Sequence, residues 1–221
     1  EDFLALCDLF FGGRRGSIHS SLFYEEGSEL PLHRDAPFVC TVPENLHLGC
    51  WFALEDSRIE NGALMGVPYS NQTFIDEHQV RNEIGLERLK VTESLDFIDE
   101  MSCLNYQQYL LDKCGRLGLK AEAIEANAGD IVVWHPLFVH GGLPHKSTAT
   151  RYSVVMFAVP ENIQVHGSYL YFTPQKPLVP QKLEYVEIPG STRYMRKGSV
   201  AFVPESRYEK CSGSLDIDIN P

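Results

Sequence analysis

The sequence predicts a mainly β protein, a sandwich or barrel of short strands with a helical segment inserted between its two halves. Short runs rich in apolar, β-branched and aromatic residues occur on both sides of a charged middle segment. Strands and helices do not alternate regularly, so a doubly wound α/β fold is not expected. The length of 221 residues fits one domain over 1–221, because all-β domains often reach this size undivided.

The first half of the chain contains a short N-terminal element and three expected strands. Residues 1–11 are apolar enough for a short helix or strand, which the following glycines end. The strands are expected at 22–24, 48–54 and 63–67. Pro68 ends the third strand because proline cannot donate a ladder hydrogen bond.

The middle segment, about residues 74–118, carries many charges and shows helical spacing. One expected helix face is formed by Tyr106, Leu110, Cys114 and Leu117. The glycines around its end are typical of a helix stop. We therefore predict a helical insertion here.

The second half of the chain returns to β-prone runs. Strands are expected at 131–134, 137–139, 152–159 and 169–172. From about residue 174 the chain is rich in proline, and we expect an irregular tail that wraps around the domain.

The charge balance restricts the class of partner. The chain has 19 Lys and Arg against 30 Asp and Glu, a formal net charge of -11. Nucleic acid and anionic membranes both favour a basic surface, so neither is expected as a partner. No apolar run approaches the ~20 residues of a membrane-spanning helix. We expect a small-molecule ligand, and no sequence feature sets an oligomeric state.

The six cysteines show neither paired nor zinc-finger spacing. We interpret them as reduced thiols, which predicts a cytoplasmic protein.

His33 and Asp35 form a His-x-Asp pattern. In an extended segment, residues two apart point to the same side, so an imidazole and a carboxylate would project together. This pattern is common by chance, and a surface loop with a turn aspartate is the alternative interpretation.

Two further groups lie near the end of the β-rich second half. His140 ends one apolar run and Arg151 begins the next. A guanidinium entering a buried strand is costly unless it is paired, either with an internal Asp or Glu or with a ligand carboxylate. Ser153 has the same strand parity as Arg151, so its hydroxyl could assist.

Together these residues suggest an iron site. Two histidines and one carboxylate on one face of the metal are typical of non-haem Fe(II) oxygenases, and they leave positions for other ligands. A 2-oxoacid can chelate such an iron, and its far carboxylate would then need an arginine.

Four segments carry a family resemblance: LPLHRDAPF at 30–38, CWFALED at 50–56, NGAL at 61–64 and AGDIVVWHPLFVHGG at 128–142. Arg151, eleven residues after the distal histidine, also matches. On these segments the chain resembles the phytanoyl-CoA dioxygenase family of Fe(II)/2-oxoglutarate-dependent oxygenases, over about residues 20–159.

The resemblance implies a double-stranded β-helix, the jelly-roll or cupin-like fold, with a helical insertion and flanking helices. It also implies that Fe(II) is held by His33, Asp35 and His140. The implied reaction hydroxylates an unactivated C–H bond with O2 and releases succinate and CO2. Halogenation is not expected, because the iron halogenases of this superfamily lack the carboxylate ligand.

The resemblance also assigns the cosubstrate pocket. Arg151 would hold the far carboxylate of 2-oxoglutarate, with help from Ser153. Trp51 matches a position that lines this pocket, although a plain core aromatic is an equal interpretation. His135 and His145 do not match the spacing of the family and are left out of the site.

Two features depart from the family pattern. The segment 68–71 reads PYSN where the family has a Pro-Gly-Ser-His-like turn, which puts substrate contacts in doubt more than the iron site. The long insertion would cover the mouth of the site, or be a plain surface cap. The acidic chain favours a free small molecule over a CoA ester.

Three alternatives remain open at this point. The first is a β-barrel that binds a metal or small ligand without catalysis. The second is an interaction module in which the insertion is the working part. The third is an oxygenase that performs desaturation, epimerisation or cyclisation at the same iron.

Overall fold

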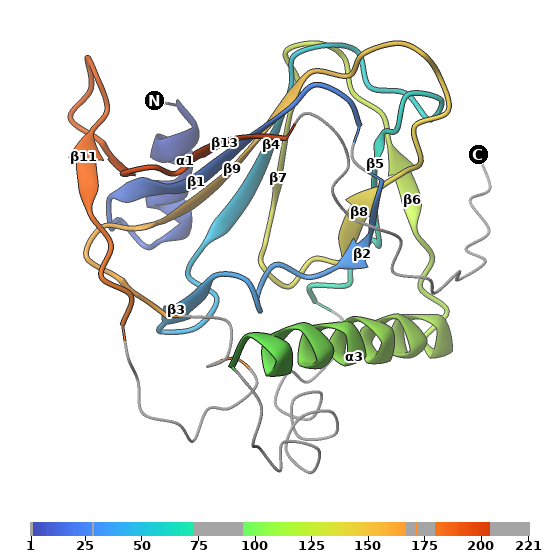
Figure 1. Ribbon diagram of the computed structural model, residues 1–221, viewed down its shortest axis with the longest axis horizontal. Helices are drawn as coiled ribbons and strands as arrows, with labels where there is room; N and C mark the ends of the chain where they lie inside the picture. The colour runs from blue at the N-terminus through green and yellow to red at the C-terminus, as the bar shows by residue number, and fades with distance from the viewer. Residues whose placement is uncertain (1, 28, 73–94, 167–170, 172–179, 204–221) are drawn as a thin grey trace.

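The computed structural model describes residues 2–27, 29–72, 95–166, 171 and 180–203, in which two β-sheets face each other (Figure 1). The larger sheet has the order β11 (Tyr185–Glu187), β12 (Tyr194–Arg196), β1 (Gly16–Tyr24), β9 (Ser153–Pro160), β4 (Leu48–Ala53) and β7 (Ile131–Trp134), with β13 (Val200–Val203) also paired to β1. The smaller sheet has the order β2 (Leu30–His33), β8 (His140–Gly142), β5 (Leu64–Gly66) and β6 (Glu122–Ile124). A separate pair joins β10 (Gln164–His166) to β3 (Cys40–Val42). This is the expected mainly β jelly roll.

The centre of the larger sheet, at β4, is buried on both faces. On its outer face, Leu48 and Cys50 pack against α1 (Asp2–Phe10), the short helix expected at the N-terminus. On its inner face, Trp51 and Ala53 pack with residues between the two sheets. Because both faces are covered, β4 is a nearly continuous apolar run instead of an alternating one.

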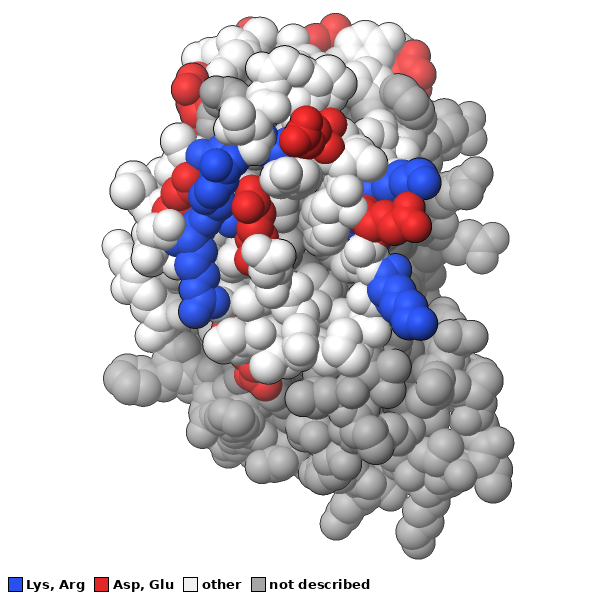
Figure 2. Space-filling model, turned by 90° about the vertical axis from the view of Figure 1, so that its left-hand side faces the viewer, with Lys and Arg blue, Asp and Glu red and all other residues white. Residues whose placement is uncertain are grey.

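The surface at one side of the molecule carries mixed charge. Figure 2 shows basic side chains standing beside acidic ones on the described part of this face. Ion pairs of this kind join Arg193 to Asp8 at 2.7 Å and Lys197 to Glu184 at 3.0 Å.

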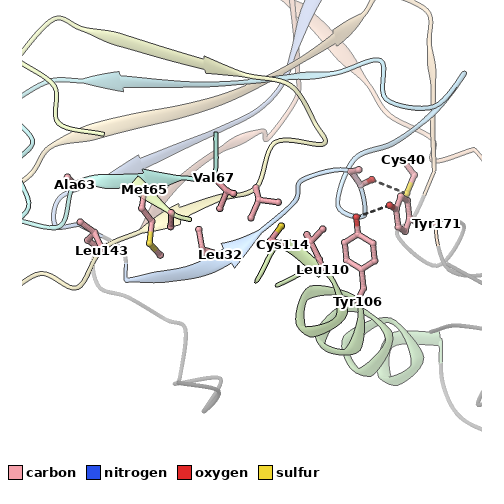
Figure 3. Close-up of a cluster of buried hydrophobic side chains, with 13 residues drawn as sticks. Leu32, Cys40, Ala63, Met65, Val67, Tyr106, Leu110, Cys114, Leu143 and Tyr171 are labelled. Atoms are coloured by element: carbon pink, nitrogen blue, oxygen red, sulfur yellow. Dashed lines mark hydrogen bonds between the residues drawn. The ribbon is translucent and has the colours of Figure 1, made fainter. Parts of the chain in front are cut away.

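The helix α3 (Leu95–Arg116) covers the smaller sheet and lies within the expected insertion, of which residues 74–94 fall outside the described part. Its buried side chains point into a core shared with that sheet (Figure 3). They include three of the four predicted: Tyr106, Leu110 and Cys114. Leu117 was predicted wrongly and is 47% exposed, because the helix ends one residue earlier and the periodicity ends with it.

The cysteines of the described residues are core thiols. Cys7, Cys40, Cys50 and Cys114 are buried thiols. Burial raises the pKa of the Cys7 and Cys50 thiols to about 12, so both stay protonated at neutral pH.

Two strand predictions need correction. Residues 137–139 form no strand: the chain turns there, with Phe138 N–H donating to the His135 carbonyl at 2.9 Å, and β8 begins at His140. The segment after residue 174, expected to be irregular, contains β11, β12 and β13. Its ladder partner is β1, so its structure depends on a distant part of the chain.

Other expectations stay untested. The strand expected at 169–172 lies, except for Tyr171, outside the described residues. The single-domain organisation over 1–221 stays a prediction. Within the described part of the chain, no helix is long and apolar enough to cross a membrane.

Candidate metal centre

The structure brings together His33, Asp35 and His140 between the two sheets. His33 ends β2 and pairs with His140, which begins β8. One ligand atom from each of the three residues lies within 4.8 Å of the others. His33 Nε2 is 3.5 Å from Asp35 Oδ1, and His140 Nε2 is 3.5 Å from Asp35 Oδ2. Asp35 and His140 are buried, and His33 is nearly so.

Both imidazoles are oriented by the backbone. His33 Nδ1 is 2.8 Å from the Pro31 carbonyl oxygen, and His140 Nδ1 is 3.0 Å from the Phe138 carbonyl oxygen. A carbonyl oxygen only accepts, so each Nδ1 carries the hydrogen and donates it. In the neutral ring this contact leaves Nε2 as the nitrogen with the lone pair, which is the arrangement of metal-binding histidines.

The charge states suit a divalent cation. Burial lowers the pKa of His140 to about 4, against the opposing effect of Asp35, so this imidazole is neutral at pH 7. Burial alone would raise the pKa of the Asp35 carboxyl, but His140, His33 and Trp134 outweigh it and hold that pKa below its usual range. A metal needs an ionised carboxylate and an unprotonated imidazole nitrogen, and Asp35 and His140 provide these.

Asp35 has a partner that sequence reasoning missed. Trp134 Nε1 donates to Asp35 Oδ2 at 2.6 Å. The sequence had indicated Trp134 only as a member of a β-prone run. Its contact spans 99 residues, and no local spacing pattern could have revealed it.

The unusual segment 68–71 supports the metal centre. Ser70 is buried, its Oγ accepts from the Val139 N–H at 2.8 Å, and its carbonyl accepts from Arg34 Nη2 at 2.6 Å. Arg34 lies between two of the candidate ligands in sequence, and Val139 precedes the third. The expectation that this segment concerns substrate contacts more than the iron site stays a prediction, and the structure adds a packing role beside the candidate ligands.

Arg151 is buried, 2% exposed, at the other end of the inner face. Arg151 was expected to begin strand β9, but β9 begins two residues later, at Ser153. Arg151 Nη1 donates to the Gly62 carbonyl at 2.5 Å, whereas Nε has no hydrogen-bond partner. Among the described residues, no Asp or Glu lies within ion-pair distance of this guanidinium. Burial lowers its pKa to about 10, which still leaves it charged at neutral pH.

Two more polar groups near Arg151 lack partners. Ser153 Oγ and Trp51 Nε1 are buried without hydrogen bonds. The Trp51 ring lies 5.5 Å from Arg151 Cζ, within cation–π range. A buried cation and buried donors without partners are costly, and a bound carboxylate would satisfy them. The donor set thus fits a 2-oxoacid beside a metal held by the three ligand candidates.

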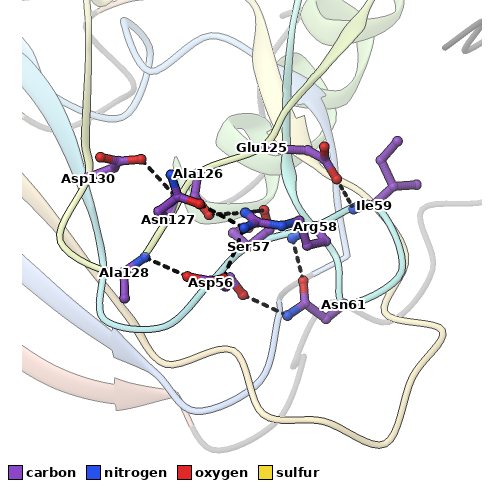
Figure 4. A network of polar contacts seen from close by, with 10 residues as sticks. All are labelled: Asp56, Ser57, Arg58, Ile59, Asn61, Glu125, Ala126, Asn127, Ala128 and Asp130. Atoms are coloured by element: carbon purple, nitrogen blue, oxygen red, sulfur yellow. Dashed lines mark hydrogen bonds and ion pairs between the residues drawn. The ribbon is translucent and has the colours of Figure 1, made fainter.

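A polar network fixes the loop that accepts from Arg151 (Figure 4). Arg58 donates to Asp56 Oδ2 at 2.9 Å and to Asn127 Oδ1 at 2.7 Å, joining two loops. Asn61 closes the turn by accepting from the Arg58 N–H at 2.7 Å. Gly62 follows with φ +81°, a conformation that favours glycine, which directs its carbonyl to Arg151.

The two excluded histidines lie elsewhere in the structure. His135 packs against Phe10 with ring centroids 5.7 Å apart, and its Nδ1 accepts from the Leu137 N–H. His145 forms an isolated bridge with Asn61. Neither belongs to the metal cluster.

Comparison with known proteins gives relatives of one kind. Residues 4–153 match the family model of phytanoyl-CoA dioxygenase (PhyH). A phytanoyl-CoA dioxygenase domain-containing protein 1 homolog of Dictyostelium discoideum is 29% identical over 133 residues, 59% of this chain and 40% of that protein. A phytanoyl-CoA dioxygenase of Arabidopsis thaliana is 25% identical over 152 residues, 67% of this chain and 46% of that protein. The chain thus spans less than half the length of either relative.

Solved structures share the fold. The non-heme alpha ketoglutarate dependent carbocyclase SnoK from nogalamycin biosynthesis aligns with a TM-score of 0.56 and 17% identity, over 82% of this chain and 66% of that one. EctD from S. alaskensis, solved with 2-oxoglutarate and 5-hydroxyectoine, aligns with a TM-score of 0.53 and 15% identity, over 91% of this chain and 60% of that one. With a family model matched over more than half of its length, the chain belongs to the phytanoyl-CoA dioxygenase family of Fe/2-oxoglutarate-dependent oxygenases.

Proposed function

We propose that this chain is an Fe(II)- and 2-oxoglutarate-dependent dioxygenase that hydroxylates an unactivated C–H bond of a small molecule and releases succinate and CO2. The observation that carries the proposal is the convergence of His33, Asp35 and His140 on one space. Arg151, on the same side of the larger sheet, supplies a buried cation that has no carboxylate partner among the described residues.

In this proposal His33, Asp35 and His140 hold Fe(II), and the bound iron with 2-oxoglutarate and O2 supplies the oxidising chemistry. One anionic and two neutral ligands leave a divalent ion with positive charge, which favours a dianionic cosubstrate. The Nδ1 hydrogen bonds keep both rings aimed at the metal.

Arg151 would orient the cosubstrate. The Gly62 carbonyl and the Trp51 ring hold the guanidinium in place. Its free Nε and the free Ser153 hydroxyl can both donate to one carboxylate. Strand β4 runs from the candidate metal ligands to the proposed cosubstrate pocket. Its residue Gly49 pairs with Trp134, which contacts Asp35, and its residue Ala53 pairs with Ser153.

The choice between hydroxylation and another oxidative outcome depends on where the substrate carbon lies. SnoK is described as a carbocyclase and a further neighbour, SnoN, as an epimerase, with a TM-score of 0.51 and 17% identity over 88% of this chain and 67% of that one. Cyclisation and epimerisation therefore stay as alternatives for this chain, together with desaturation.

An anaerobic titration tests the proposal. The apoprotein receives Fe(II) and then 2-oxoglutarate while the visible spectrum is recorded. We expect the weak metal-to-ligand charge-transfer band of the chelate in the wild type, and no band in Asp35→Ala. Asp112→Ala, which removes an exposed carboxylate of α3, is the matched control and should behave as the wild type.

The outcomes separate the candidates. A band followed by succinate release on admission of O2 supports the oxygenase. Iron binding without a band favours a non-catalytic metal-binding barrel. A band of wild-type intensity in Asp35→Ala would overturn the ligand assignment.

A further inference from the structure

The contact between Trp134 and Asp35 bridges the two sheets next to the candidate metal. Trp134 ends β7 of the larger sheet, whereas Asp35 follows β2 of the smaller sheet. Both side chains are buried, and the indole N–H donates to Oδ2 at 2.6 Å. A short hydrogen bond to an ionised acceptor is stronger than a neutral one.

The Trp134 ring occupies a space that the glycine at position 49 leaves open. Trp134 pairs with Gly49 across the sheet, and a Cβ at Gly49 would lie 2.3 Å from the indole Nε1. Only glycine at this position lets the ring lie so close to the strand. The His140 ring lies near the indole, with centroids 4.6 Å apart. The ring is therefore held between β4 and a candidate ligand, which fixes the direction of its N–H.

Asp35 needs such an anchor. Its two oxygens face different imidazoles at the same distance of 3.5 Å, so these contacts alone do not decide which oxygen binds a metal. The indole engages Oδ2 only. Oδ1 is then the oxygen left to the ion.

We propose that Trp134 is a positioning residue of the metal centre: its N–H holds the Asp35 carboxylate by Oδ2, so that Asp35 offers the metal a single oxygen, Oδ1. This inference rests on the proposed function. A one-oxygen ligand leaves a coordination position that a two-oxygen carboxylate would occupy, and a chelating cosubstrate needs that position. Loss of an outer-sphere partner of this kind typically lowers metal affinity about 10- to 100-fold.

Titration of the metal-free 221-residue chain with Co(II) alone tests the inference by absorbance. We expect Trp134→Phe to bind Co(II) at least about tenfold more weakly than the wild type. We also expect a weaker d–d band per bound Co(II), because a carboxylate released from the indole can chelate and raise the coordination number. A purely structural role of the ring would not change that band. The matched control is Phe10→Leu, which changes a partly exposed aromatic ring of α1 outside the proposed site and should leave Co(II) binding unchanged.

An isosteric replacement isolates the hydrogen bond. Incorporation of β-(3-benzothienyl)alanine at both tryptophan positions keeps the ring shapes and removes only the N–H donors. We expect this protein to bind Co(II) at least about tenfold more weakly than the wild type. The comparison does not depend on whether Trp134→Phe folds. Wild-type affinity and band intensity in the isosteric protein would overturn the proposal, because ring packing alone would then suffice. A wild type that binds Co(II) no better than Asp35→Ala would instead show that the proposed metal centre itself is wrong.

Discussion

At the scale of single residues, the proposed site combines groups that would bind the metal and the cosubstrate with groups that hold them in place. Arg151 belongs to the first kind. We expect Arg151→Lys to weaken 2-oxoglutarate binding to the Fe(II)-loaded protein on the order of 10- to 100-fold, because an ammonium cannot replace a fork of charged hydrogen bonds. The measurement is the 2-oxoglutarate dependence of the charge-transfer band, with the exposed Arg14→Lys as control. An unchanged dependence would show that Arg151 does not hold the cosubstrate.

The grouping of the three candidate ligands could be predicted from the sequence, whereas the residues that support them could not. His33 and Asp35 share a side because they lie two apart, and the cost of a buried cation drew attention to Arg151. The indole of Trp134 and the buried guanidinium of Arg34 act through contacts with residues far along the chain. Such contacts exist only once the two sheets have closed, so no local pattern contains them.

At the scale of elements, the pairing of β2 with β8 sets the spacing of two candidate ligands. A Cβ at Gly141 would lie 2.5 Å from the Leu30 carbonyl oxygen, so Gly141→Ala must push these strands apart. We expect weaker Co(II) binding and a lower melting temperature, read by absorbance titration and thermal denaturation. Gly115→Ala in α3, where an added Cβ meets nothing within 4 Å, should be neutral or slightly stabilising. Equal behaviour of the two variants would contradict the spacing argument.

The α1 helix is joined to the C-terminal strands through Asp8. Its carboxylate accepts from Arg193 Nη1 at 2.9 Å and Nη2 at 2.7 Å and from the Gly16 N–H at 2.7 Å. Arg193 holds the pKa of Asp8 below its usual value, so this stability is present above about pH 4 and lost as the pH falls further. We expect Asp8→Asn to lower the free energy of unfolding by about 1–2 kcal/mol at pH 7.

Thermal or urea denaturation at pH 7 and at pH 3 measures this effect. The two proteins should converge in acid, where the wild-type carboxylate also takes up a proton. A difference that persists unchanged at pH 3 would mean that charge is not the cause.

At the scale of the whole molecule, buried imidazoles make the fold sensitive to acid. Burial lowers the pKa of both His19 and His47 to about 4. Because the unfolded chain binds protons from about pH 6.5, the free energy of unfolding should fall as the pH drops from 6.5 to 4. Each histidine contributes up to about 1.4 kcal/mol per pH unit.

Denaturation of the metal-free protein across this pH range tests the prediction. His47→Leu should flatten the slope, whatever its effect at pH 7. A variant with the wild-type slope would show that His47 is not the source.

The fold class could also be predicted from the sequence, but the C-terminal strands that complete the larger sheet could not. The apolar runs at 48–54 and 131–134 predicted β4 and β7 because buried strands are continuous apolar segments. The strands after residue 174 were missed, since these short segments gain their structure from pairing: β12 and β13 pair with β1, and β11 pairs with β12.

The position of β1 has a consequence for biosynthesis. Its antiparallel partner β9 lies roughly 130 residues later in the chain, a stretch that a ribosome takes on the order of ten seconds to make at about 5–20 residues per second. Throughout that interval the backbone edge of β1 has no β9 to pair with. In the same way, His33 has no His140 beside it until the second half of the chain is made. A nascent chain is thus open to chaperones during this interval, and it can capture a metal at this cluster only after its second half has emerged.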